Sequence, residues 1–155
     1  MEKQTQEELN KIKEKLDGLL EKWIGFNQYD ANLLSKIKLV KWEKGSVVYS
    51  MNVDPELCNM FGTLHGGAQA TLVDVLGSMA IFSLDPTPNT IVPSVSVEIS
   101  VNYASSAPRD STVYIHSNCY KQGKNLVFTE TTIKNDKDEV VCKGSHTKFV
   151  LKSKM

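Results

Sequence analysis

Residues 59–83 read NMFGTLHGGAQATLVDVLGSMAIFS, an apolar run that opens with a His-Gly-Gly turn and holds a single carboxylate, Asp74. The apolar side chains of residues 68–84 fall on every side of a helical wheel, so we expect a helix that the rest of the chain surrounds. Pro86 and Pro88 prevent this helix from continuing. The segment therefore predicts a central core helix.

The sequence after this helix has the pattern of β-strands. Residues 94–103, SVSVEISVNY, alternate between apolar and polar side chains, which predicts a strand with one apolar and one polar face. Further strand-like runs cover residues 112–120, 125–134 and 140–151, with turn-forming residues between them. Connections this short join antiparallel neighbours, so we expect an α+β fold in which an antiparallel sheet wraps around the helix.

The first part of the chain predicts a separate helix. Leucine, isoleucine and tryptophan side chains recur at helical spacing between charged residues and stop before Gly25, as on one face of an amphipathic helix. Residues 47–53 then alternate like a half-buried strand. We therefore divide the chain into an N-terminal helical extension, residues 1–25, and one domain, residues 26–155.

Composition argues against several classes of protein. The chain has 18 basic and 18 acidic residues without a block of either sign, so we expect no nucleic-acid partner. No apolar stretch reaches the roughly 20 residues of a membrane span. The cysteines lack metal-ligand spacing, and we recognise neither a signal peptide nor an acid-poor presequence. We expect a cytoplasmic protein, with a mitochondrial location as the alternative.

Asp74 lies about two turns inside the expected core helix. A carboxylate that leaves water without a partner costs several kcal/mol, so a function would explain its position. Burial disfavours the charged form, which would suit a carboxylate to act as a general base near neutral pH. The alternative is a structural carboxylate that hydroxyl or backbone donors satisfy. Burial alone does not decide between the two.

His65, Gly66 and Gly67 open the helix. A glycine inside a helix loses about 1 kcal/mol relative to alanine, so another gain has to offset it. Glycine lets a ligand approach the backbone, and the free N–H groups of a first helical turn can donate to a negatively charged oxygen. That geometry is an oxyanion hole. The alternative is a tight turn in which His65 is a capping or surface residue.

The spacing of these two features has a consequence for assembly. Asp74 follows Gly66 by eight residues, or about 12 Å along a helix that rises 1.5 Å per residue. The two groups of one chain therefore cannot reach the same carbonyl. If both act on one substrate, the carboxylate comes from a second subunit whose core helix runs antiparallel. Catalysis by these residues thus requires a homodimer.

Residues 59–67 and 70–74 closely resemble the core motif of hotdog-fold acyl-CoA thioesterases, in the group of the phenylacetate-pathway thioesterases and thioesterase superfamily member 2. The resemblance extends over roughly residues 30–150. It continues through residues 94–97, 120–124 and 144–148. It implies a hotdog fold, hydrolysis of acyl-CoA to a free carboxylic acid and CoA, a place in fatty acid metabolism, and a homotetramer built from homodimers.

The resemblance also implies roles for individual residues. The Gly66 N–H would polarise the thioester carbonyl, and the partner subunit's Asp74 would activate the attacking water. Ser96 would help to hold that water, while Asn59 and His65 would position the thioester and its sulfur. The expected substrate-binding residues, with the lysines as candidates for the coenzyme A phosphates, are Gly67, Lys121, Lys124, Lys143 and Lys148. No metal and no cofactor is expected, because coenzyme A is part of the substrate.

Two positions depart from the family pattern. Glu98 replaces a shorter acid, and Gly77 stands one turn after Asp74 in the core helix. Both changes would reshape the acyl tunnel, so the preferred acyl chain stays undetermined.

Alternative functions stay open at this point. One is a hotdog dehydratase or hydratase with a histidine as the acid–base group, and another is a non-catalytic acyl-CoA-binding protein. A Cys-His hydrolase built from Cys58 and His65 lacks an identified third group. The order of Gly-Gly and then Asp favours hydrolysis.

Overall fold

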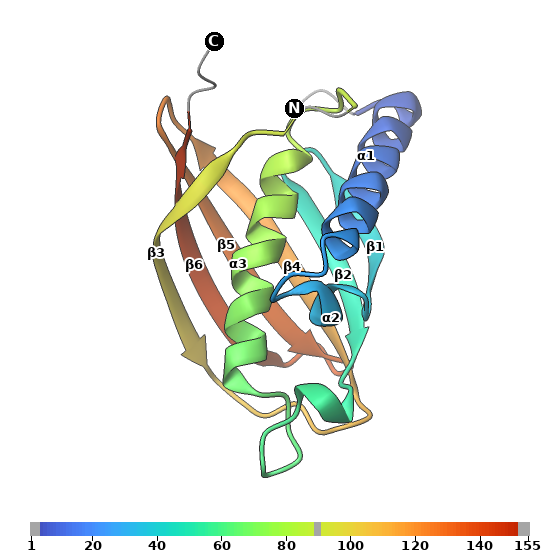
Figure 1. Ribbon diagram of the computed structural model, residues 1–155, viewed down its shortest axis with the longest axis vertical. Coiled ribbons are helices and arrows are strands. Elements are labelled where there is room, and N and C mark those ends of the chain that lie inside the picture. The colour runs from blue at the N-terminus through green and yellow to red at the C-terminus, as the bar shows by residue number, and fades with distance from the viewer. Residues whose placement is uncertain (1–3, 89–90, 152–155) are drawn as a thin grey trace.

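The computed structural model describes residues 4–88 and 91–151, in which one antiparallel sheet wraps around a long helix (Figure 1). The six strands lie in the order β1-β2-β4-β5-β6-β3. Their bounds are β1 Ile37–Glu43, β2 Ser46–Asn52, β3 Ser94–Tyr103, β4 Thr112–Gln122, β5 Leu126–Asn135 and β6 Val140–Val150. The helices are α1 Gln6–Gly25, α2 Ala31–Leu34 and α3 Gly66–Phe82, with a 3-10 turn η1 at Pro55–Leu57. The predicted α+β hotdog fold is confirmed.

Helix α3 crosses the concave face of the sheet, where it packs mainly on β4 and β5 (Figure 1). Residues 75–81 are all buried, which confirms a core helix over its C-terminal half. In the N-terminal half one face stays open. This face consists of four residues at helical spacing, none of which is buried: Gly67, Ala70, Thr71 and Asp74. The prediction that protein surrounds α3 on every side is therefore wrong for the single chain, because no element of the sheet reaches this face.

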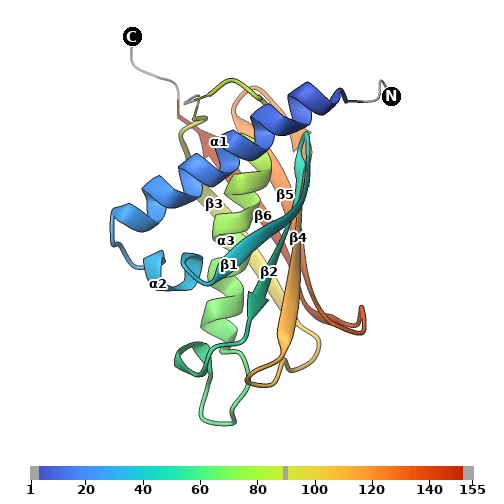
Figure 2. The same cartoon turned by 90° about the vertical axis from the view of Figure 1, so that its right-hand side faces the viewer.

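The core lies between α3 and the inner face of the sheet, and it extends beneath α1. Ile12 and Leu16 of α1 are fully buried in the same cluster as the side chains of α3. Each such aliphatic side chain contributes about 1.5–3 kcal/mol when it leaves water. Trp42 of β1 donates its Nε1–H to the Leu9 carbonyl of α1 at 2.8 Å. Figure 2 shows α1 running obliquely to α3. The amphipathic N-terminal helix is confirmed, while the division into extension and domain stays a prediction.

Strand β3 contains a β-bulge that the sequence pattern did not predict. Ser96 pairs with Lys148 of β6, whereas Glu98 pairs with the preceding residue, Thr147. Val97 is therefore an extra residue, and the two faces of the strand exchange there. Cross-strand partners point to the same face, so Ser96 points inward with the buried Lys148 and Glu98 points outward. The prediction of one apolar and one polar face along the whole strand is wrong.

Strand β3 is also one edge of the sheet, since it pairs with β6 alone. Four of its apolar side chains are 41–59% exposed: Val95, Val97, Ile99 and Tyr103. An edge strand with exposed apolar side chains can pair with another chain, and native proteins usually cover it.

Residues 4–88 and 91–151 contain neither a candidate membrane-spanning helix nor a candidate metal cluster. None of the helices there has both the length and the hydropathy that a membrane crossing needs. No group of three or more His, Cys, Asp or Glu side chains in these ranges is arranged to hold a metal ion.

Candidate active site

The Asp74 carboxylate is the centre of a polar cluster that α3, β3 and β6 bring together. Ser96 Oγ donates to Asp74 Oδ1 at 3.3 Å. His146 Nε2 and Lys148 Nζ each lie 3.6 Å from the same oxygen. His146 and Lys148 are two residues apart on β6, so both side chains point to the helix side of the sheet. The cluster therefore places a carboxylate, a hydroxyl, an imidazole and an ammonium at one site.

Asp74 is accessible in the single chain, contrary to the expectation of burial. Its side chain is 48% exposed, because it lies on the open face of α3. It borders a cavity of about 480 Å³ whose polar lining includes Ser78, Ser96 and Lys148. The apolar part of its lining is made of Trp23, Val75, Phe82, Val92, Pro93, Val95 and Leu151, with Ile91. A carboxylate at this boundary can contact both water and an apolar ligand.

His146 orients the hydroxyl of Ser96. The two side chains are joined by a hydrogen bond of 2.9 Å between Nε2 and Oγ. The other ring nitrogen, Nδ1, is buried and has no hydrogen-bond partner among the described residues. Burial, with a smaller effect from the Lys148 charge, lowers the pKa of His146, so the ring is neutral. Because Ser96 donates its only hydroxyl hydrogen to Asp74, it accepts from His146, which assigns the ring proton to Nε2.

Lys148 does not lie where the sequence analysis expected it. Its side chain is only 8% exposed, and its ammonium donates to Ser78 Oγ at 3.0 Å beside Asp74. An ammonium buried beside a carboxylate is a poor position from which to meet a phosphate at the surface, so these contacts argue against its role in binding coenzyme A phosphates, which stays a prediction.

The other candidate lysines lie at the surface. Lys143 is 3.2 Å from the Glu130 carboxylate, which reduces the charge available to a ligand. Lys121 and Lys124 are exposed at the connection between β4 and β5. Their contact with coenzyme A phosphates stays a prediction.

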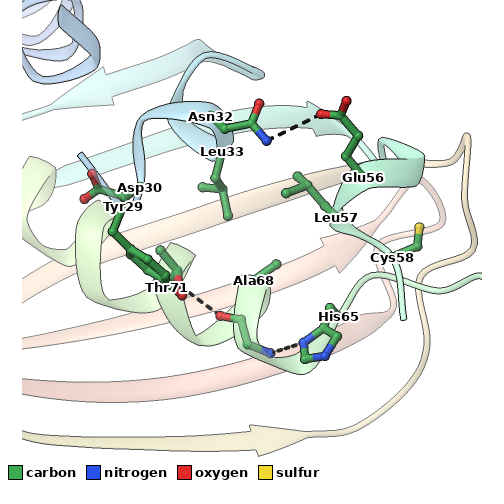
Figure 3. Close-up of a pocket in the computed structure, with 11 residues that line it drawn as sticks. Tyr29, Asp30, Asn32, Leu33, Glu56, Leu57, Cys58, His65, Ala68 and Thr71 are labelled. Atoms are coloured by element: carbon green, nitrogen blue, oxygen red, sulfur yellow. Dashed lines mark hydrogen bonds between the residues drawn. The ribbon is translucent and has the colours of Figure 1, made fainter. Parts of the chain in front are cut away.

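The His-Gly-Gly turn forms the N-terminus of α3 as expected. His65 is the N-cap, and its Nδ1 accepts the Gly67 N–H at 2.8 Å (Figure 3). The Gly67 N–H is therefore occupied within the chain, and the expected contact of Gly67 with substrate stays a prediction. The Gly66 N–H has no acceptor among the described residues, as the first N–H of a helix usually has none. Gly66 thus carries a free donor at the start of the helix.

Gly66 also packs closely against an aromatic side chain. Tyr103 donates its hydroxyl to the Gly66 carbonyl at 3.0 Å. A Cβ at Gly66 would lie 3.3 Å from Tyr103 Cε1, so a larger residue would press on the ring. Tyr103 comes from the edge strand β3, and sequence reasoning did not identify it as a neighbour of the turn.

Asn59 shapes the loop before α3. Its Oδ1 accepts the Phe61 N–H at 2.9 Å and the Thr63 N–H at 3.3 Å. Its Nδ2 donates to Thr63 Oγ1 at 3.0 Å. This pattern is an Asx-type turn that fixes the loop ahead of His65. The role of Asn59 in positioning a thioester stays a prediction.

A second cavity, of about 310 Å³, lies beside the start of α3 (Figure 3). His65 and Thr71 border it from α3, Leu33 from α2, and Leu57 and Cys58 from the η1 segment. The Cys58 thiol donates to the Asp54 carbonyl at 3.4 Å, and Figure 3 shows its sulfur directed away from the His65 ring. This arrangement does not support a Cys-His hydrolase.

The two positions that depart from the family pattern do not line the cavity beside Asp74. A Cβ at Gly77 would lie 2.7 Å from Thr129 Oγ1 and 3.5 Å from His146 Nδ1, so Gly77 lets α3 approach the sheet. Glu98 points outward because of the bulge at Val97. Their predicted effect on an acyl tunnel is therefore not supported by their positions.

Comparison with known proteins decides the family. Residues 61–142 match the model of the thioesterase superfamily. The chain belongs to the thioesterase superfamily. It is 38% identical over 119 residues to acyl-coenzyme A thioesterase 13 of Homo sapiens, covering 76% of this chain and 82% of that protein. The predicted family and the predicted class of enzyme, a thioester hydrolase, are confirmed.

Solved structures agree with this member of the thioesterase superfamily. Thioesterase superfamily member 2 from Mus musculus is 31% identical and superposes with a TM-score of 0.76, covering 88% of this chain and 95% of that one. The PaaI protein of E. coli, from the phenylacetic acid degradation operon, has a TM-score of 0.76 over 93% of this chain and 96% of that one. Its identity is only 18%, so it supports the fold alone.

Sequence reasoning found part of this thioesterase site. It identified Asp74, Ser96 and the turn at Gly66, whereas it missed the contacts of His146 and Lys148 with Asp74. The alternation of residues 144–148 contained a signal, because it places His146 and Lys148 on one face of a strand. The sequence does not say that this face meets the middle of α3.

Proposed function

We propose that the protein is an acyl-CoA thioesterase that hydrolyses acyl-CoA to a free carboxylic acid and coenzyme A. The observation that carries the proposal is the Asp74–Ser96 pair on the border of an open, partly apolar cavity. The names of its relatives support the substrate class. Fatty acid metabolism and a cytoplasmic location stay predictions of the sequence.

In the proposed reaction Asp74 is the general base. Its carboxylate takes a proton from a water molecule held between Asp74 and Ser96, and the water oxygen attacks the thioester carbonyl carbon. The free Gly66 N–H donates to the oxygen that becomes negative. The tetrahedral intermediate then collapses, the carbon–sulfur bond breaks, and the thiolate of coenzyme A takes the proton that Asp74 accepted from the water, which returns Asp74 to its carboxylate form. His146 donates to Ser96 and so keeps its hydroxyl hydrogen directed to Asp74.

A second copy of the chain would complete the site. Gly66 and Asp74 are both on α3 and eight residues apart, about 12 Å at the rise of an α-helix. The open face of α3 and the apolar edge strand β3 would both be covered if two chains packed about a two-fold axis. Each of two identical sites would then combine the Gly66 N–H of one protomer with the partner's Asp74. Pairing of such dimers into a homotetramer stays a prediction.

Thiol release from a panel of acyl-CoA esters, from acetyl to palmitoyl with aryl examples, tests the activity. We expect Asp74→Asn to lower kcat by about 10²–10⁴-fold, the usual contribution of a general base, while KM stays near that of the unchanged protein. Glu21→Gln, an exposed acid on α1, is the matched control and should leave both constants unchanged. Equal turnover by Asp74→Asn would remove Asp74 as the base.

The same panel, with a hydroxyacyl-CoA added, distinguishes the alternative functions. A non-catalytic binder would bind acyl-CoA without releasing thiol, and a dehydratase would convert a hydroxyacyl-CoA while its thioester stays intact. Either result would overturn the proposed hydrolysis.

A further inference from the structure

Lys148 is buried at the site without being assigned a part in the proposed reaction. It is one of two lysines among the described residues that are at most 6% exposed, the other being Lys15. An ammonium ion leaves water only where a negative or polar partner compensates for the lost hydration. Its partners therefore indicate its role.

The polar partners of Lys148 all belong to one turn of α3. Its Nζ donates to Ser78 Oγ at 3.0 Å and lies 3.6 Å from Asp74 Oδ1. Ser78 Oγ in turn donates to the Asp74 carbonyl at 3.3 Å. The hydroxyl of Ser78 thus accepts from the lysine and donates to the backbone of the carboxylate residue. This geometry fixes the ammonium on one side of Asp74.

His146 does not contribute a positive charge beside the Asp74 carboxylate. It lies at the same 3.6 Å from Asp74 Oδ1, but its Nδ1 is buried without a hydrogen-bond partner in the described part of the chain. Protonation would add a second N–H with no acceptor, which is unfavourable in a buried site. The tight approach of Gly77 to this nitrogen, with a Cβ that would lie at 3.5 Å, leaves little room for water. Lys148 is therefore the cation of the cluster.

We propose that Lys148 is a positioning residue that keeps the Asp74 carboxylate ionised when a second subunit and a substrate remove water from it. This inference rests on the proposed thioesterase function. Desolvation favours the neutral form of a carboxyl group, and a cation within about 4–6 Å opposes that effect. An ion pair of this kind is needed most when the 48% exposed side chain of Asp74 is covered. Lys148 would act through Asp74 and would not touch the substrate.

The pH dependence of kcat/KM tests the proposal. The titratable groups that contact Asp74 or line its cavity are His146, Lys148 and Asp30. In Lys148→Met the neutral side chain no longer favours the carboxylate, so we expect the acid limb of the profile to move to higher pH by roughly one unit. KM on the alkaline plateau should not change. An unmoved acid limb, or a raised KM at constant kcat, would overturn the proposal in favour of substrate binding by Lys148.

Two further variants separate charge from packing. Lys15→Met removes the other buried ammonium, which donates to the Asp85 carbonyl at 2.6 Å, and should leave the pH profile unchanged. Ser78→Ala removes the hydrogen-bond acceptor but keeps the positive charge, so its shift should be smaller than that of Lys148→Met. An equal shift would contradict an effect of charge.

Titration of the Asp74 carboxyl by carbon-13 NMR in the full chain separates this inference from the proposed function. A wild-type protein that releases no thiol would refute the function, yet the titration midpoint of Asp74 could still be compared between variants. We expect that midpoint to lie higher in Lys148→Met than in the wild type. If Lys148→Met does not fold, Lys148→Gln, whose side chain is polar but neutral, takes its place, and a higher midpoint in that variant supports the proposal. Midpoints that do not change would overturn the electrostatic role in either case.

Discussion

At the scale of single residues, Gly77 determines how closely α3 approaches the sheet. A Cβ there would lie 2.7 Å from Thr129 Oγ1, closer than real Cβ atoms come, and would also touch the His146 ring. His146 carries the hydrogen bond to Ser96, so the packing of one glycine supports the orientation of a hydroxyl at the candidate active site. A larger residue at position 77 would therefore affect both the stability of the fold and the geometry around Asp74.

Replacement by alanine is expected to have opposite effects on stability at two helical glycines, Gly77 and Gly18. Gly77→Ala forces a contact into a packed core and should lower the free energy of unfolding by about 1–3 kcal/mol. Gly18→Ala on α1 meets nothing within 4 Å and should raise it by up to about 1 kcal/mol, because alanine is the better helix former. Denaturant titration followed by circular dichroism measures both. A Gly77→Ala protein as stable as Gly18→Ala would show that the core accepts a methyl group there.

At the scale of elements, α1 forms a wall of the cavity beside Asp74. Trp23 near its C-terminal end lines the apolar part of that cavity, together with Phe82 from α3. The buried residues Ile12 and Leu16, near the middle of the same helix, hold it on the core. The N-terminal helix is therefore in a position to influence which acyl group the cavity accepts.

Trp23→Ala is expected to shift the preference of the enzyme toward longer acyl chains. Removal of the indole enlarges the cavity, so kcat/KM for long-chain relative to short-chain acyl-CoA should rise about tenfold, within the range that small changes in apolar contact produce. Ile12→Ala loosens α1 without lining the cavity and is the control for lost packing. The chain-length profile of thiol release measures the effect. An identical change in both variants would attribute it to packing of α1 rather than to the cavity wall.

Comparison of particular elements shows what periodicity can predict. Helix α3 and strands β4 to β6 lie close to their predicted ranges, because the apolar pattern of a core element reflects its own burial. The face change at Val97 was missed, because a bulge arises from pairing with β6 and leaves the local pattern regular. The burial of Lys148 was missed for a related reason. Its charge is typical of a surface residue, and the compensating Asp74 is far away in the sequence.

In the whole assembled molecule, two chains would share each active site. The free Gly66 N–H and the Asp74 carboxylate lie on one rigid helix, so a single protomer cannot bring them to one thioester. Helix α3, whose N-terminal half has an uncovered face, and strand β3, whose apolar side chains are exposed, are neighbouring elements of the fold (Figure 1). Dimerisation and catalysis would then depend on the same surface.

A variant that removes the donor is available at Gly66; its added Cβ would lie 3.3 Å from Tyr103 Cε1, and Gly66→Ala, which adds the same contact but keeps the N–H, is the matched control. Proline has no N–H and is well tolerated at the first position of a helix, where that N–H makes no helical bond. The preceding residue, His65, has φ −60° and ψ 137°, a conformation that a following proline favours. Gly66→Pro should therefore fold and dimerise while it loses activity. Size-exclusion chromatography with light scattering checks its assembly.

The most direct test mixes Asp74→Asn chains with Gly66→Pro chains, each inactive alone, under conditions that exchange subunits. In a mixed dimer one site combines the intact Gly66 of the first chain with the partner's Asp74, and the other site carries both defects. Random pairing then predicts recovery of about a quarter of wild-type thiol release. Mixed dimers that form, as seen by native mass spectrometry, but release no more thiol than either parent would contradict the shared site.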